Sequence, residues 1–256
     1  MSGARRERFE VDGRIRVELN LPSGRAAFLP GGPEAVEVTV EGRQADEFVV
    51  ERVGDGIVLR TPGSARSRWD SFDLTVRMPA GGELEVRAAS ADVRAEVELG
   101  SLKVDVASGE VVAGGVAGEA TVRSASGDVE LGDVAGDLAV NTASGDVRVR
   151  QIGGRAMLNS ASGDVRVGET LGVLAVSSQS GDVKVGRYAG EDLECGSTSG
   201  NVRIGLPPGL NLDVDVNTVS GEIRSDFAPE EGNGATARLR VKTISGDIIL
   251  HRASER

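Results

Sequence analysis

The chain contains one cysteine, one histidine and few aromatic residues, and each shortage argues against a class of protein. The single cysteine, Cys195, excludes an internal disulfide framework. The single histidine, His251, has no nucleophile or metal-ligand partner in the sequence, so neither triad catalysis nor a zinc site is expected. Aromatic residues make up only 3% of the chain, which leaves few rings against which a sugar could stack.

Long apolar runs and an excess of positive charge are also missing. The net charge is −11, whereas nucleic-acid binders present a basic face to phosphates, so we expect no nucleic-acid partner. No apolar run approaches the roughly 18 residues of a membrane span, and we predict none. The basic residues near the start precede Phe9-Glu10-Val11-Asp12 instead of the apolar segment of a signal peptide. The sequence therefore favours the cytoplasm, or an extracytoplasmic location if an export signal was removed.

The chain is rich in one repeated phrase, Ser-Gly followed by an acidic residue or Asn and then by Val or Ile. A degenerate copy, Ser90-Ala91-Asp92-Val93, precedes eight others. These begin at Ser108, Ser126, Ser144, Ser162, Ser180, Ser199, Ser220 and Ser245. Counted from Ser90, the spacing is 18 residues five times and then 19, 21 and 25. So strict a period indicates one supersecondary unit stacked many times, as in a solenoid.

Aliphatic residues recur six and four positions before each serine and three positions after it. Apolar residues at every second position are typical of a strand with one buried face. Each unit would hold two strands, joined on one side by the Ser-Gly-acidic turn and on the other by a turn with a glycine (Gly136, Gly154, Gly172, Gly190). The sequence predicts an all-β fold, a β-solenoid with two short strands per ~18-residue coil and about nine coils.

Residues 9–80 alternate like strands but lack the repeated phrase, and they hold most of the rings (Phe9, Phe28, Phe48, Trp69 and Phe72). A solenoid needs an atypical end segment, because a bare coil end is an exposed sheet edge. We predict an irregular N-terminal β cap over 9–80, continuous with solenoid repeats over 81–251, and flexible tails at 1–8 and 252–256.

Two charged columns follow the serines, an acidic one two residues on and a mostly basic one four residues on. The candidate interaction face consists of Asp146, Arg148, Asp164, Arg166, Asp182 and Lys184. Stacked carboxylates are potential calcium ligands, but the Gly-Gly-x-Gly-x-Asp signature of calcium β-rolls is absent. Alternating acidic and basic stripes are explained more simply by a surface charge ladder. We therefore predict no catalytic residue, no metal site and no cofactor.

Two further columns are expected to face the core. Hydroxyl residues two positions before each serine point inward by alternation, where they would hydrogen bond near the turn. Cys195 falls in an aliphatic column between Val176 and Val216, which favours a buried small hydrophobe over a reactive thiol.

The repeats, together with two related phrases, resemble a known bacterial family. The phrases are Met78-Pro79-Ala80-Gly81-Gly82-Glu83-Leu84 and Leu206-Pro207-Pro208-Gly209-Leu210-Asn211-Leu212. The family is a bacterial β-strand-repeat domain of unknown function, also labelled “putative adhesin”, and the resemblance runs from about Phe9 to Leu250. It implies a single-stranded β-solenoid with a surface or envelope-associated binding role and no established catalytic residues.

We interpret the chain as a non-enzymatic, adhesin-like binding or scaffolding module whose partner is a protein or another repetitive polymer, including a second copy of itself. One alternative is a self-assembling filament protein whose coil ends pair, since the short tail after the last coil, Arg238 to Leu250, guards a sheet edge weakly. Another is a carbohydrate-active enzyme on a β-helix, which would need a cleft with two carboxyl groups about 5–10 Å apart.

Overall fold

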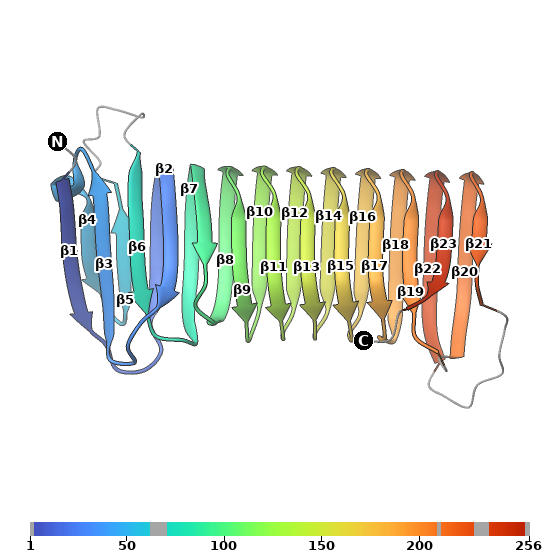
Figure 1. The fold of residues 1–256 in the computed structure, drawn as a ribbon, viewed down its shortest axis with the longest axis horizontal. Coiled ribbons are helices and arrows are strands. Elements are labelled where there is room, and N and C mark those ends of the chain that lie inside the picture. The colour runs from blue at the N-terminus through green and yellow to red at the C-terminus, as the bar shows by residue number, and fades with distance from the viewer. Residues whose placement is uncertain (1–2, 62–70, 209–210, 228–235, 254–256) are drawn as a thin grey trace. The chain divides into compact units, whose positions relative to one another are not determined.

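The computed structural model describes residues 3–61, 71–208, 211–227 and 236–253, which fall into two compact units, Met1–Gly132 and Asp133–Arg256. Both units consist of β-strands, and the one helical element among the described residues is a short 3-10 turn, η1 (Ala45–Glu47). The all-β prediction is confirmed, and Figure 1 shows the strands ranked side by side within each unit.

The first unit combines antiparallel and parallel strands. Its strands are β1 (Gly3–Glu10), β2 (Arg16–Pro30), β3 (Ala35–Gly42), β4 (Val49–Val53), β5 (Gly56–Arg60), β6 (Phe72–Met78), β7 (Gly82–Ala95), β8 (Leu99–Ser108), β9 (Val111–Val116), β10 (Ala120–Ser126) and β11 (Val129–Val134). β1, β3 and β6 pair antiparallel, as do β4 and β5. From β7 onward the described pairs are parallel, as a solenoid requires.

The start of the chain differs from the prediction of a flexible tail over 1–8. β1 begins at Gly3 and pairs with β3 in unbroken register from Gly3↔Gly42 to Glu10↔Ala35. The half-buried face of β1 includes the charged residues Arg5 and Glu7. The alternation of apolar and polar residues that identifies a strand in a sequence is therefore missing here. Arg5 donates hydrogen bonds to Glu7 and to the carbonyl oxygen of Phe48 at 2.8 Å, so its charge is satisfied at a half-buried position.

β2 is out of sequence order. It pairs in parallel with β7 along one edge and with β5 and β6 along the other, although β3 to β6 separate it from β7 in the chain. Its Phe28 is buried, as are Phe48 and Phe72, whose ring centroids lie 5.1 Å apart. Three of the five rings expected in this region are therefore buried in its core, whereas Phe9 is half-buried and Trp69 lies outside the described residues.

The second unit is a stack of coils, each made of two strands. Its strands are β12 (Leu138–Ser144), β13 (Val147–Ile152), β14 (Ala156–Ser162), β15 (Val165–Thr170), β16 (Leu174–Ser180), β17 (Val183–Tyr188), β18 (Asp192–Ser199), β19 (Val202–Leu206), β20 (Asn211–Ser220), β21 (Ile223–Ser225), β22 (Thr236–Ser245) and β23 (Ile248–Arg252). Residues 18 apart pair in parallel, for example Val147↔Val165 and Leu138↔Ala156. Outside the coil Asn211–Ser225 the aliphatic columns are buried as predicted, so solenoid stacking is confirmed in this unit.

The last coil in sequence is not the last coil in space, which corrects the prediction. β22 lies between β18 and β20, and β23 lies between β19 and β21 (Figure 1). The outermost coil is therefore Asn211–Ser225, not Arg238 to Leu250. Cys195 consequently pairs with Val176 and Val241, not with Val216. Both coils carry the same residue types in the same columns, so the repeat pattern alone does not decide their order.

The predicted C-terminal tail is also shorter than expected. Arg252 belongs to β23, where it pairs with Leu206, and Ala253 is buried. Residues 254–256 lie outside the described part of the chain.

Candidate functional site

Each Ser-Gly-acidic phrase forms a sharp corner between two strands, and the glycine makes this corner possible. Gly163 has a φ of 127°, which side-chain-bearing residues rarely adopt. A Cβ atom there would lie 2.2 Å from the carbonyl oxygen of Gly145 in the neighbouring coil. The glycine column thus lets the corners stack closely enough for the strands to pair.

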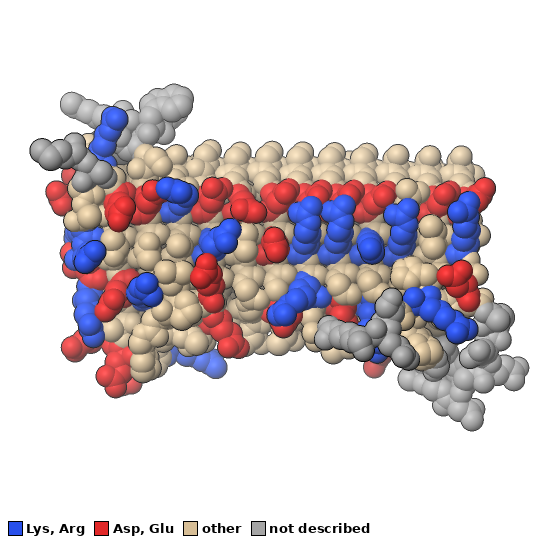
Figure 2. All heavy atoms as spheres, viewed as in Figure 1, with Lys and Arg blue, Asp and Glu red and all other residues tan. Residues whose placement is uncertain are grey.

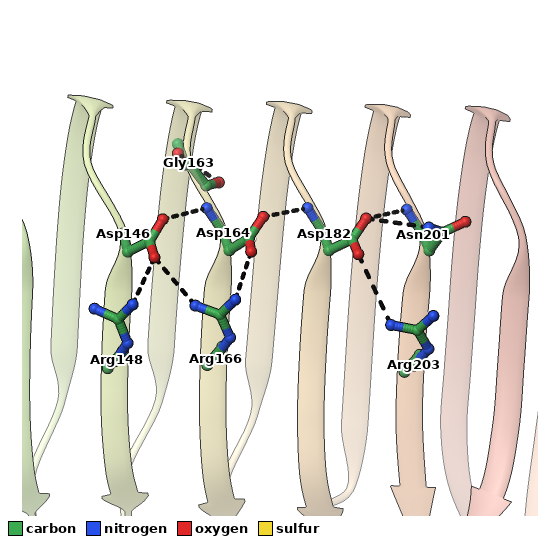
Figure 3. A network of polar contacts seen from close by, with 9 residues as sticks. Asp146, Arg148, Gly163, Asp164, Arg166, Asp182, Asn201 and Arg203 are labelled. Carbon is green, nitrogen blue, oxygen red and sulfur yellow. Dashed lines mark hydrogen bonds and ion pairs between the residues drawn. The ribbon is translucent and has the colours of Figure 1, made fainter.

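The acidic residue after each glycine ties one coil to the next. One carboxylate oxygen of Asp146 accepts a hydrogen bond from the backbone N–H of Asp164 at 3.0 Å, and Asp164 accepts one from Asp182 at 2.9 Å (Figure 3). Asp182 in turn accepts the N–H of Asn201 at 2.8 Å, and the side-chain oxygen of Asn201 accepts that of Asp247 at 3.0 Å. An aspartate at this corner therefore stabilises the stack itself.

The second carboxylate oxygen faces the basic column. Arg148 donates to Asp146 at 2.6 Å, and Arg166 donates to both Asp164 at 2.6 Å and Asp146 at 3.1 Å (Figure 3). Arg203 lies 3.8 Å from the Asp182 carboxylate. The charge ladder expected from the sequence forms, with arginines bridging within and between coils.

These contacts change the acidity of Asp146. The backbone N–H of Asp164 is the largest cause that lowers the pKa of the Asp146 carboxyl group. The hydrogen bond from Arg166 and the charges of Arg148 and Arg166 lower this pKa further, while partial burial opposes them. Asp146 is thus held as a carboxylate by the stack it stabilises.

All six predicted residues lie on one face of the second unit, which we call the charged face. Arg148, Arg166 and Lys184 occupy the same register position on β13, β15 and β17, and Arg203 follows on β19. Figure 2 shows Lys and Arg side chains in a row beside a row of Asp and Glu. Within the described chain no carboxylate forms an ion pair with Lys184. The charged face as defined holds three aspartates and three cations, so the two charged columns balance within it.

The carboxylates of this face are engaged by backbone N–H groups and arginines instead of facing one another. Across the described residues, no group of three or more His, Cys, Asp or Glu side chains is arranged to hold a metal ion. The acidic column therefore serves the stack in this structure.

The hydroxyl column faces inward as predicted. Ser124, Thr142 and Ser160 are buried, and the Thr142 hydroxyl donates to the carbonyl oxygen of Ser144 at 3.2 Å. Cys195 is buried too, and desolvation raises the pKa of its thiol to about 12, which suits a packing residue and not a nucleophile. His251 lies on β23, with Nδ1 3.0 Å from the carbonyl oxygen of Arg252.

The described surface includes several hollows. One of about 340 Å³ is lined by Glu18, Asp55 and Glu83, but Glu83 already binds the Arg16 guanidinium at 2.8 Å. A second, of about 540 Å³, lies over β1, β3 and β6 and is lined by Arg6, Arg8 and Arg77. A third, of about 370 Å³, lies beside Gly196 on β18.

The match to a family model decides the affiliation of the chain. Residues 35–251 match the family described as Toastrack DUF4097, a domain of unknown function. The chain belongs to this family. The resemblance to a bacterial β-strand-repeat family of unknown function is thereby confirmed. No curated protein matches the chain.

Solved structures that are similar to this Toastrack chain have low sequence identity to it, and the first one below has the same overall fold. A “putative adhesin” from Parabacteroides distasonis is 15% identical, with a TM-score of 0.51, over 96% of this chain and 97% of that chain. A “putative adhesin” from Bacteroides fragilis is 15% identical, with a TM-score of 0.43, over 97% of each chain. A “putative lipid binding protein” from Parabacteroides distasonis is 13% identical, with a TM-score of 0.38, over 96% of each chain. Separately, no helix in the described ranges is long and apolar enough to cross a membrane.

One feature of the second unit escaped sequence analysis, namely the exposed coil Asn211–Ser225. A signal for it was present, because the repeat spacing lengthens to 21 and 25 residues on either side of Ser220. Longer connections are what a chain needs in order to pass beyond one coil position and return to it.

Proposed function

We propose that this protein is a non-enzymatic binding or scaffolding module whose charged face binds an elongated partner, either a protein or another repetitive polymer. The observation that supports this most is the in-register row Arg148, Arg166, Lys184 and Arg203 on four successive coils. Coils repeat at about 4.8 Å, so the row offers one cation at each step. Contacts that are weak singly become strong when many act together.

The chemistry of the face favours a partner with repeated carboxylates. Its own carboxylates already accept backbone N–H groups and arginine donors, whereas its cations are still accessible. The side chains of Arg148 and Arg166 are each 43% exposed. A guanidinium has five N–H donors, and Arg166 uses few of them within the ladder. An acidic protein segment or a polyuronate would meet the remaining donors.

The test uses immobilised poly-glutamate and alginate as probes. We expect the wild-type protein to be retained at low salt and the double variant Arg148→Glu/Arg166→Glu to lose retention. The matched control, Arg240→Glu/Lys242→Glu, makes the same change of net charge on β22, outside the charged face. The proposal fails if the two double variants elute alike, or if the wild type binds neither polymer.

The alternative of a carbohydrate-active enzyme has less support. The family description names no activity, and the hollow with three carboxylates loses one of them to the Arg16 ion pair. Incubation with a polysaccharide panel and assay for new reducing ends tests it, and release of reducing ends would replace the binding proposal with an enzymatic one.

We also propose that the cap, 9–80, and the repeats, 81–251, act as one continuous domain. In the first unit β2 of the cap pairs with β7 of the repeats from Arg16↔Glu83 to Phe28↔Ala95. A single calorimetric unfolding transition is expected, and two separate transitions would contradict it.

The adhesin names of similar structures favour the cell exterior as the compartment of this domain. Cell fractionation tests this, and recovery of the protein in the cytoplasmic fraction alone would contradict it.

A further inference from the structure

The outermost coil of the second unit, Asn211–Ser225, has one occupied side and one open side. β20 pairs with β22 from Asn211↔Thr236 to Ser220↔Ser245, and β21 pairs with β23 over Ile223 to Ser225. In the part of the chain that the structure describes, no strand pairs with the opposite edge of either. Backbone N–H and C=O groups along these edges are therefore ready to pair with another strand.

The open side also exposes residues that belong to the core columns. Val214 pairs with Leu239 and Ile223 pairs with Ile248, and both partners are completely buried. Val214 and Ile223 are nevertheless 45% and 49% exposed, because no described coil covers them. A strand added here would bury both side chains and continue the aliphatic columns.

The β20 part of this edge lacks several of the features that usually protect an edge strand. β20 contains no proline and no lysine, and its inward positions carry no charge. It is also ten residues long, which gives an incoming strand a long ladder. An exposed edge of this kind is suited to β-strand addition.

The charge of the coil identifies the kind of strand that fits. Residues 211–227 include Asp213, Asp215, Glu222 and Asp226 but only one cation, Arg224. Arg238 and Arg240 of the coil beneath lie 3.8 and 3.9 Å from Asp213 and Asp215, which are 68% and 64% exposed. Such long, exposed ion pairs are weak, so the two carboxylates are available to a basic partner.

Glu222 provides a further contact for such a strand. In the coils beneath, the acidic side chain accepts an N–H from the next coil. One carboxylate oxygen of Glu222 binds Arg224, and across the described residues its other oxygen has no hydrogen-bond donor. An incoming strand would present its own N–H to this oxygen.

A second copy of the protein is a poorer occupant. A two-fold interface would place the same patch on both sides, which sets the four carboxylates of one coil against those of its partner. Like charges across an interface are destabilising. A two-fold dimer through this edge therefore meets repulsion.

We propose that the open edge of β20 and β21 is a docking site for an extended, basic segment of another protein, in which apolar residues alternate with Lys or Arg. The segment adds as a further strand, places its apolar residues over Val214 and Ile223, and directs its cations toward Asp213 and Asp215. This site is distinct from the charged face, for which the proposed partner is anionic.

The test titrates the full-length protein into a fluorescent twelve-residue peptide of alternating valine and lysine interrupted by threonines. Glutamate replaces lysine in a second peptide, and a third is scrambled. Saturable binding of the basic peptide is expected, with the other two at least about tenfold weaker, a free-energy difference of about 1.4 kcal/mol. Equal affinity for all three peptides would overturn the proposal.

Two variants locate the binding. Val214→Lys/Ile223→Lys puts charge on the open side and should weaken binding at least about tenfold. Met157→Lys is the control, because Met157 is an apolar residue of similar exposure, 54%, on β14, whose edges are taken by β12 and β16. It should leave affinity within about twofold. If the double lysine variant bound the basic peptide with unchanged affinity, the proposal that the peptide binds at this edge would be wrong.

A charge swap keeps the test decisive if the lysine variant unfolds. Asp213→Lys/Asp215→Lys alters only exposed side chains and should shift preference from the basic to the acidic peptide. If preference stays unchanged, the charge argument is wrong. Light scattering on the same samples detects any dimer. If Val214→Lys abolishes this dimer and the basic peptide does not displace it, the edge is a site of self-association instead.

Discussion

At the scale of single residues, the corner of each coil carries the strongest constraints. The glycine there adopts a backbone conformation that other residues avoid and lies against the carbonyl of the coil beneath. The aspartate after it reaches the next N–H because its side chain is short and ends in an acceptor. The main role of the Ser-Gly-Asp phrase is therefore structural, because it forms the corner of each coil and hydrogen bonds one coil to the next.

Replacing the corner glycine should be costly. Gly163→Ala introduces a Cβ that would meet the Gly145 carbonyl oxygen at 2.2 Å and imposes an unfavourable φ. We expect a loss of about 3 kcal/mol or more in the free energy of unfolding. Gly196→Ala is the control, since its Cβ meets no atom within 4 Å, and it should stabilise by about 0.5 kcal/mol. Urea denaturation measures both, and equal stabilities would refute the steric account.

Two substitutions at Asp146 should separate its backbone contact from its ion pairs. Asp146→Asn keeps the acceptor, as Asn201 does naturally, and should cost about 0.2–1 kcal/mol. Asp146→Ala removes the acceptor as well and should cost about 1.5–3 kcal/mol. Urea midpoints at pH 7 measure the difference. If Asp146→Ala lost less stability than Asp146→Asn, the backbone hydrogen bond would not be the larger contribution of Asp146.

The stability that Asp146 contributes should depend on pH. Its pKa in the folded protein is below the ordinary value of 3.8, first because of the Asp164 N–H and then because of the arginines. The charged form is favoured by folding, so the stabilisation is complete above the unfolded pKa and is lost as pH falls through the lower folded pKa. The stability gap between wild type and Asp146→Asn should narrow from pH 7 to pH 3. A gap that widens at low pH would reverse the sign of the shift.

At the scale of elements, the coil is the unit of structure, and its order along the stack need not follow the chain. Both units show this, because β2 lies beside β7 and β22 lies between β18 and β20. The repeat columns were predictable because burial imposes them on every coil. The columns of the two last coils are equivalent and do not predict their order, for which the longer spacings on either side of Ser220 were the one signal in the sequence.

Engineered disulfides can check this order in a Cys195→Ala background. Glu194 and Arg240 are register partners, about 4.8 Å apart, so Glu194→Cys/Arg240→Cys should form a disulfide. Asp215 is one coil further, about 9.6 Å away, so Glu194→Cys/Asp215→Cys should stay reduced. Mass spectrometry after mild oxidation distinguishes them. Formation of only the second bridge would restore the sequential order of coils.

Removing one whole coil should be tolerated. Deletion of residues 146–163 joins Gly145 to Asp164 and preserves every column, so the protein should fold with a modest loss of stability. Deletion of 146–162 leaves one extra residue, which reverses the faces of the following strand. Circular dichroism and thermal denaturation compare the two, and equal stability would contradict the column model.

At the scale of the whole molecule, charge governs association. With a net charge of −11 and an acidic terminal coil, copies should repel at pH 7. Light scattering should give a mass near 26.5 kDa at low salt over a wide range of concentrations. Near the isoelectric point, about 4.8, the mass should rise, and Val214→Lys/Ile223→Lys should suppress that rise. A concentration-dependent mass at pH 7 would instead support the filament alternative.

The sequence by itself determined the all-β class, the coil, the inward aliphatic and hydroxyl columns, and the adjacency of Asp146, Arg148, Asp164 and Arg166. It did so because alternation and an 18-residue period leave only one way to bury the aliphatic face. Only the tertiary structure decided that β1 begins at Gly3, that β22 and β23 lie inside the stack, and that Val214 and Ile223 are exposed. These features depend on which of several equivalent surfaces meet in space. A repeated pattern predicts the same strands and the same buried positions for every coil, so it does not distinguish between them.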